Sequence, residues 1–258
     1  MRCPAAPTLH LAALAAAWLA GCGTGPIDAV SLGPAALSSD LVAHWSFDEG
    51  TGTVVHDDSG HGHDGALSGS TWSWLEHGRL AGALHLEQGD YVAVDGFPNA
   101  TPGWTVAVWV QFASANVGID EVTVISTEKV FTGGWEINLL APSGEGDLRY
   151  HFGFWTGPTS VEYAHYECKG CVHPDQWQHL AVVVDGAAGT MAFYLDGALQ
   201  GRQSIPRAIS PGVSTLYMGR WSTPDPARLL VGSLDDVAIW SRALVSEEIG
   251  LLTQAAVP

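Results

Sequence analysis

The chain has 258 residues, and its 27 Asp and Glu against 10 Lys and Arg give a formal net charge of −17 at pH 7. So acidic a balance argues against nucleic acid and anionic lipid surfaces as electrostatic partners, and it suits cation binding. The length fits one large all-β domain that follows a short leader.

The N-terminus carries a secretion pattern. One positive charge, Arg2, precedes an apolar run from Leu9 to Leu19, which is too short for a transmembrane helix of about 20 residues and typical of a signal peptide. The run ends in Leu-Ala-Gly-Cys, which resembles the lipobox of bacterial lipoproteins and implies that Cys22 becomes the lipidated first residue; an ordinary signal peptide is the alternative. We therefore expect a signal peptide over 1–21 and a protein anchored by lipid outside the cytoplasm, in the bacterial cell envelope at the outer membrane or cell surface.

Residues 22–40 contain small residues, Gly and Pro without a periodic apolar pattern, which predicts a flexible tether. Beyond it, short runs that alternate apolar and polar residues are separated by Gly, Pro and Asp clusters, as in a β-sandwich or barrel. The runs that we expect to be strands are 42–48, 105–112, 121–127, 135–141, 148–155, 179–185, 190–196, 213–219 and 233–240.

Helical periodicity is convincing only in 243–254, where Ser246 can cap a helix with two glutamates in its first turn. We therefore expect one domain over 41–254, followed by a tail over 255–258. Its contact with the membrane is expected only through the lipid anchor.

Four stretches in this order carry a family resemblance: HWSFDEGTGTVVHDDSGHGHDGAL (44–67), WTVAVWVQF (104–112), WQHLAVVVDGAAGTMAFYLDGAL (177–199), and LYMGRW with GSLDDVAIWSRALVSEEI (216–249). Together they resemble the laminin-G-like jelly-roll domain of secreted bacterial proteins. The resemblance implies an antiparallel jelly-roll β-sandwich of the concanavalin A-like lectin/glucanase type, with one short C-terminal helix.

The segment HDDSGHGHDG, residues 56–65, is the most distinctive stretch of polar residues. Its glycines let the backbone turn sharply, and its aspartates offer the oxygens that calcium prefers. In the resembling family, an N-terminal acidic turn, this loop and an acidic pair near the C-terminus surround a structural calcium ion. The residues that the resemblance places around calcium here are Glu49, Asp57, Gly60, His61, His63, Asp64 and Asp235.

Two alternatives remain for this loop. His61 and His63 stand where the family commonly has Asn, and with His56 they raise the possibility of a zinc site, because imidazole suits zinc better than calcium. The loop could also be a solvated turn without a metal.

Cysteine usage outside the cytoplasm predicts a disulfide between Cys168 and Cys171. A zinc site formed by His165, Cys168, Cys171 and His173 is the first alternative. A redox pair is the second, although no βαβ pattern surrounds the two cysteines.

Hydrolases of this fold resembling laminarinases carry Glu-x-Asp-x-x-Glu, which places two carboxylates together. The closest stretch here begins at Glu136 but has Asn138 and Ala141 at the other two positions, and Glu121 and Glu128 are seven residues apart. No Gly-x-Ser-x-Gly elbow is present either. We therefore expect no enzyme.

The tryptophans nearer the predicted loops suggest a platform for a sugar ring, and the residues chosen for it are Trp72, Trp74 and Trp221. The sequence thus predicts a surface-anchored, non-catalytic binding module that contains calcium and recognises a carbohydrate or a glycosylated partner. Protein–protein adhesion without sugar is the alternative, and a glycoside hydrolase is a weaker one.

Overall fold

The computed structural model describes residues 36–117, 119–127, 133–140, 148–155, 163–205, 212, 214–222, 225 and 228–257. They belong to the unit Leu32–Pro258, whereas the unit Met1–Ser31, with the expected signal peptide and Cys22, lies outside the described residues. Within the described part, no helix is long and apolar enough to cross a membrane.

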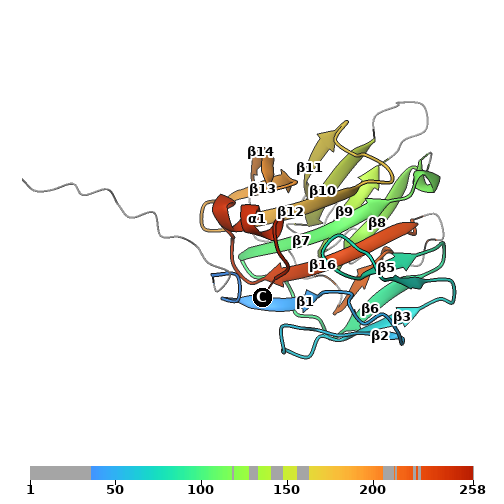
Figure 1. Ribbon diagram of the computed structural model, residues 1–258. Coiled ribbons are helices and arrows are strands. Elements are labelled where there is room, and N and C mark those ends of the chain that lie inside the picture. The colour runs from blue at the N-terminus through green and yellow to red at the C-terminus, as the bar shows by residue number, and fades with distance from the viewer. Residues whose placement is uncertain are drawn as a thin grey trace, which may run out of the picture. The chain divides into compact units, whose positions relative to one another are not determined.

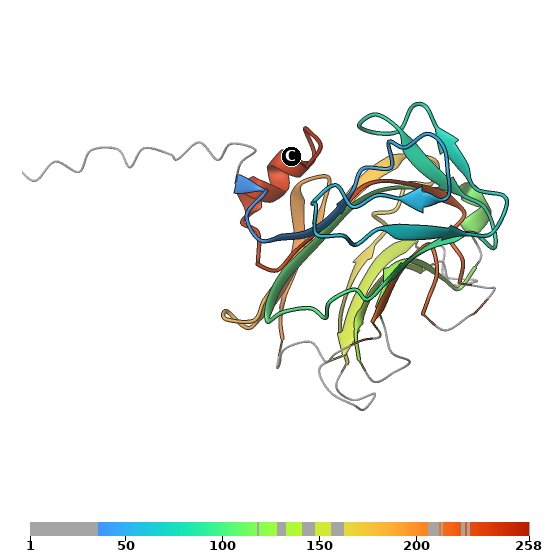
Figure 2. The ribbon, with the colours of Figure 1, turned by 90° about the horizontal axis from the view of Figure 1, so that it is seen from below.

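Two antiparallel sheets stacked face to face form the domain (Figures 1 and 2). The first, sheet A, has the order β14-β13-β12-β7-β16-β5-β4, and β1 also pairs with β16. Its strands are β1 Leu41–Trp45, β4 Ser73–Leu75, β5 Ala83–Leu86, β7 Gly103–Phe112, β12 Trp177–Asp185, β13 Thr190–Leu195, β14 Ala198–Ser204 and β16 Gly232–Trp240.

The second sheet, sheet B, has the order β11-β10-β9-β8-β15-β6-β3-β2. Its strands are β2 Val54–Val55, β3 Gly65–Ser68, β6 Tyr91–Asp95, β8 Glu121–Ser126, β9 Trp135–Leu140, β10 Arg149–Trp155, β11 Tyr163–Lys169 and β15 Thr215–Met218. The two sheets and their antiparallel pairing confirm the predicted sandwich, and the nine predicted runs all contain strands.

The strands that the sequence did not reveal are short or lie at a sheet edge. β2 has two residues, and β11 and β14 are edge strands whose polar residues break the apolar alternation. Edge strands in natural proteins are commonly polar because their unpaired backbone faces solvent. Apolar periodicity therefore detects the longer core strands. It misses the polar edge strands and also the short strands β5 and β6, although Leu84, Leu86, Val92 and Val94 lie in the main core.

The main core lies between the sheets and is rich in aromatic rings. Trp104 of β7 and Trp135 of β9 face each other across it, with their ring centroids 4.7 Å apart. Since successive strand residues point to opposite faces, Ile137 and Leu139 join Trp135 in the core. Glu136 and Asn138, which alternate with them, face away from sheet A.

A second core forms between the other face of sheet A and the helix α1 (Ser246–Leu252), which is seen beside β12 and β13 in Figure 1. The helix begins one residue earlier than expected, because Val245 rather than Ser246 is its N-cap. Glu248 stabilises this end: its carboxylate accepts the Val245 N–H at 2.9 Å and pairs with Arg242 at 2.7 Å.

The packed region extends beyond the predicted domain limits at both ends. Leu37, placed by the sequence in the tether, is buried against the second core, and its carbonyl accepts a hydrogen bond from the Trp240 indole at 2.6 Å. Val257, placed in the tail, is also buried there. Both segments therefore belong to the folded domain.

Candidate functional site

The carboxylate of Asp57 organises the acidic loop. Its two oxygens accept the backbone N–H groups of His44 at 3.0 Å, Ser59 at 3.0 Å and His63 at 2.9 Å. Burial raises the pKa of Asp57, but the hydrogen bonds from Ser59, His63 and His44 outweigh it, so the pKa lies below its usual value. The Asp57 carboxylate thus fixes the backbone of its own loop through hydrogen bonds, a structural role that was not predicted from the sequence.

Two of the other predicted oxygen ligands already accept hydrogen bonds within the fold, whereas Glu49 keeps one oxygen without a partner. Asp64 accepts the Asp57 N–H at 2.8 Å, and the carbonyl of His63 accepts the Trp45 indole N–H at 2.8 Å. Glu49 accepts the His56 N–H at 2.6 Å through one oxygen, whereas its second oxygen is buried and has no hydrogen-bond partner in the structure. That orphaned carboxylate oxygen is what a cation at this end of the molecule would satisfy.

Positive φ angles at Gly60 (79°) and Gly62 (83°) allow the loop to close around Asp57. The histidines between the glycines do not converge. The His61 ring contacts the Ser59 hydroxyl at 3.0 Å, and the His63 ring packs on Phe97 with a centroid distance of 5.3 Å. His56 instead lies 3.5 Å from Asp64. The structure therefore does not assemble the three-histidine zinc site.

Asp235, on β16, accepts the backbone N–H groups of Arg79 at 2.7 Å and Leu80 at 2.9 Å. Burial, together with the charges of Asp236 and Asp48, raises its pKa to about 6 despite those hydrogen bonds. Asp48, whose carboxylate accepts the Gly82 N–H at 2.6 Å, is thus the N-terminal acidic residue whose charge Asp235 feels. Glu49 was predicted at this site from the sequence, whereas Asp48, its neighbour in the same acidic turn, was not.

Cys168 and Cys171 form a disulfide, as predicted. With both sulfurs in that bond, the alternative zinc site with His165 and His173 is wrong.

Of the three tryptophans predicted to form a sugar platform, two are partly exposed and one is buried. Trp72 and Trp74 are half-buried and meet edge to face, with ring centroids 6.3 Å apart, and the Trp74 indole donates to the Gly52 carbonyl at 3.1 Å. Trp221 was expected to be exposed, but only 7% of it is. The Arg228 guanidinium lies 4.2 Å over its ring, which covers the face that a sugar would need, so this assignment is wrong.

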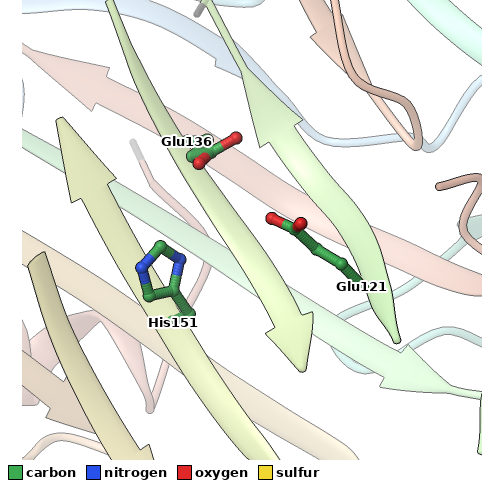
Figure 3. Close-up of side chains that lie close together, drawn as sticks. All are labelled: Glu121, Glu136 and His151. Carbon is green, nitrogen blue, oxygen red and sulfur yellow. The ribbon is translucent and has the colours of Figure 1, made fainter. Parts of the chain in front are cut away.

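A group of polar side chains that the sequence did not reveal lies on the face of sheet B that is turned away from sheet A. Glu121 of β8, Glu136 of β9 and His151 of β10 place one ligand-type atom each within 4.8 Å of one another (Figure 3). No other group of three or more His, Cys, Asp or Glu side chains meets this condition among the described residues, and the predicted calcium ligands form none. We call Glu121, Glu136 and His151 the sheet B triad.

Burial and charge distinguish the triad from the acidic loop. Only 5% of Glu136 and 7% of His151 is exposed. Burial, followed by the charges of His165, Arg149 and Arg228, lowers the pKa of His151 to about 3, so its imidazole is neutral. Arg228 pairs with Glu121 at 2.6 Å.

Two further buried residues border the triad. Asn138 lies opposite His151 in the β9–β10 ladder and opposite Thr123 in the β8–β9 ladder. Its amide nitrogen donates to the Glu121 carboxylate at 2.5 Å, whereas its amide oxygen and the Thr123 hydroxyl are buried without a hydrogen-bond partner. The sequence offered one trace of this site, the Glu-x-Asn step at 136–138, but pairing with residues 121 and 151 depends on strand register.

Comparison with known proteins gives a family and a fold. Residues 86–250 match the model of a laminin G family described as the concanavalin A-like lectin/glucanases superfamily. None of the curated proteins matches the chain significantly.

The similar solved structures include three binding domains of botulinum neurotoxins. The receptor-binding domain of type G has a TM-score of 0.62 at 16% identity, over 84% of this chain and 51% of that one. The binding domain of serotype D gives 0.62 and 16% over 85% and 52%, and that of the C/D mosaic gives 0.63 and 16% over 84% and 51%. The chain therefore spans about half the length of these neighbours, and at such identity the likeness concerns the fold alone.

Proposed function

The chain belongs to the concanavalin A-like lectin/glucanases superfamily, and from that premise we propose that it is a non-catalytic binding module for a carbohydrate or a glycosylated partner. The neighbours in fold are named as receptor-binding domains, which supports binding rather than catalysis. A fold alone does not give a function, so the proposal depends on features of this chain.

The Trp72–Trp74 pair is the observation that carries the proposal. Both rings remain partly exposed although aromatic residues elsewhere in the described sandwich are mostly buried. A tryptophan presents a flat apolar face together with a polar N–H, and that combination suits the apolar face and the hydroxyl groups of a sugar ring. Glu76 and His77, which follow β4 in the chain, are exposed polar residues.

Calcium is the second part of the proposal. The orphaned oxygen of Glu49 supports it, together with the raised pKa of Asp235 beside Asp48 and Asp236, because a divalent cation would stabilise closely placed carboxylates. Glu49, backbone carbonyls of the loop and Asp235 of β16 would hold the ion. Its role would be structural, since it would tie the N-terminal turn to the strand before the C-terminal helix.

Anchoring in the cell envelope is the third part, and it rests on the sequence Leu-Ala-Gly-Cys. Acylation needs the thiol, so Cys22→Ser should remove all label from a fatty-acid probe in the bacterial host. Label that persists on the variant would contradict a lipid anchor at this residue.

A glycan array probed with the full chain tests sugar recognition. Trp72→Ala should weaken the strongest binding signal about tenfold, because an aromatic contact contributes about 1.5 kcal/mol, and Trp72→Phe should restore most of it. Leu199→Ala is the control, since it removes an exposed apolar side chain from β14.

Three outcomes would decide against the proposal. Equal losses in Trp72→Ala and Leu199→Ala would remove the tryptophan pair from the site. Binding to a glycoprotein that survives its deglycosylation would favour protein–protein adhesion. Release of reducing sugar from any bound glycan would show a hydrolase instead.

A further inference from the structure

Strand register, rather than loop conformation, holds the sheet B triad together. β9 is hydrogen-bonded to β8 on one side and β10 on the other, so Glu121, Glu136 and His151 come from three adjacent strands (Figure 3). Ligands presented by strands keep their positions better than ligands on loops. Figure 3 shows the Glu121 carboxylate extending toward β9, where Glu136 lies, with the imidazole on the far side of β9.

Burying the ionisable side chains of the triad on a sheet face is unfavourable for the free energy of folding. Glu136 and His151 are almost fully buried, and two carboxylates stand near each other. Buried carboxylates in proteins are paired or coordinate metals. Arg228 balances the charge of Glu121 from the side, and a divalent cation between the two carboxylates would balance both.

Two buried polar atoms beside the sheet B triad lack hydrogen-bond partners. The amide oxygen of Asn138 is buried and lacks a hydrogen-bond partner, while the nitrogen of the same amide touches the Glu121 carboxylate. The hydroxyl of Thr123, opposite Asn138, is also buried and unpartnered. Buried polar atoms in proteins nearly always have a hydrogen-bond partner, and those that lack one often contact a bound ion or water molecule.

From this geometry we propose that the outer face of sheet B binds one divalent first-row transition-metal ion through Glu121, Glu136 and His151, with the amide oxygen of Asn138 as a fourth ligand. The imidazole decides the class of metal, because calcium and magnesium prefer all-oxygen sites whereas zinc and its neighbours accept nitrogen. Four tetrahedral bonds of about 2 Å place ligand atoms roughly 3.3 Å apart, so the side chains need only close inward from their present separation.

Arg228 has a supporting role in this site. Its contact with Glu121 leaves the second oxygen of that carboxylate facing Asn138 and the triad. Groups that orient a ligand in this way typically change metal affinity 10–100-fold when they are removed. The site is separate from the proposed sugar platform and calcium loop, so its presence does not depend on either.

Cobalt(II) is a suitable probe, because its visible absorption reports its ligands. Titrating the full chain should give visible bands that saturate at one equivalent, and Zn²⁺ should displace the cobalt while a hundredfold excess of Ca²⁺ should not. His151→Gln and Glu136→Gln, which nearly preserve volume, should each weaken cobalt binding more than about 100-fold, since a ligand matters more than the groups that orient it.

The matched control is the double variant His61→Ala/His63→Ala, which removes two imidazoles from the acidic loop and should bind cobalt as the wild type does. Zn²⁺ should also raise the melting temperature of the wild type and of the control but not of His151→Gln, while circular dichroism verifies that each variant is folded. The proposal is overturned by any one of three results: wild-type protein without cobalt bands, bands that survive both triad substitutions, or bands lost in the loop variant.

Discussion

Two regions of the molecule gather carboxylates and histidines, and they do so in opposite ways. The acidic loop collects them from ten consecutive residues, and its central carboxylate, Asp57, is saturated by backbone N–H groups of His44, Ser59 and His63. The sheet B triad collects them from three strands, and beside it Asn138 and Thr123 keep buried atoms without partners. A stretch of sequence rich in Asp and His therefore does not indicate that its side chains are available to bind a ligand.

The physical reason is the distance between a side chain and its own backbone. In a tight loop a short Asp carboxylate reaches nearby N–H groups, so much of its hydrogen-bonding capacity is used locally. In a sheet the backbone groups are already paired along the ladder, so side chains on one face can satisfy only one another or a ligand. A cluster on a sheet face is thus the better place to look for a binding site.

Removing the Asp57 carboxylate should have the largest effect on stability. Asp57→Ala leaves three backbone N–H groups without their charged acceptor, and hydrogen bonds to charged groups contribute about 1.5–3 kcal/mol each without being additive. We expect the free energy of unfolding in urea to fall by about 3 kcal/mol, even in excess chelator. Asp57→Asn keeps one acceptor oxygen and should lose less.

Asp58→Ala is the control for that comparison. Asp58 lies next to Asp57 but is exposed, and among the described residues its carboxylate accepts a hydrogen bond only from the Ser46 hydroxyl, at 2.6 Å. Its loss should stay within about 0.5 kcal/mol. If both variants lost the same free energy in chelator, Asp57 would have no special structural role.

Calcium provides the next test, because it would give the loop region a ligand as well. A cation that binds only the native state at a hundred times its Kd stabilises it by about 2.7 kcal/mol. Chelation should therefore lower the melting temperature of the wild type, and Glu49→Gln should remove most of that difference by neutralising the orphaned oxygen. Glu87→Gln, on an exposed residue, should retain it; a melting temperature indifferent to chelator would leave the region without calcium.

Much of the fold could be predicted from the sequence because it depends on local patterns. Alternation in 105–112 and 179–185 identified β7 and β12, and Cys168 and Cys171 are close enough in the chain for their pairing to be anticipated. The triad depends on which residues of β8, β9 and β10 stand opposite each other, and no local pattern encodes that. The burial of Trp221 likewise depends on Arg228 lying over its ring.

Acid should destabilise the domain through its buried histidines. Burial, together with the charge of Arg79, lowers the pKa of His179 on β12 to about 3, whereas an unfolded histidine titrates near 6.5. As pH falls below about 6.5, His179 becomes protonated in the unfolded state but stays neutral in the folded state. The free energy of unfolding therefore falls by about 1.4 kcal/mol per pH unit for this residue, until the pH nears 3.

Urea unfolding between pH 7 and pH 4.5 measures that slope. His179→Gln should reduce it by nearly one proton, and His173→Gln, an exposed control, should leave it unchanged. His151, whose pKa is lowered in the same way, should contribute a similar slope in metal-free protein. A slope unaffected by His179→Gln would mean that this imidazole is protonated in the fold.

The smallest expected effect is that of a substitution beside the sheet B triad, and it is unusual because the substitution should not lower the free energy of unfolding. Thr123→Val replaces a buried, unpartnered hydroxyl on sheet B with a methyl group of the same shape. Removing an unsatisfied buried polar group is neutral or favourable, so the free energy of unfolding should stay level or rise by up to about 1 kcal/mol in metal-free protein. Ser126→Ala on the same strand is a control, because Ser126 is buried but has a partner, and it should lose stability. A clear loss in Thr123→Val would show that its hydroxyl is satisfied in solution, and the outer face of sheet B would then resemble the saturated loop.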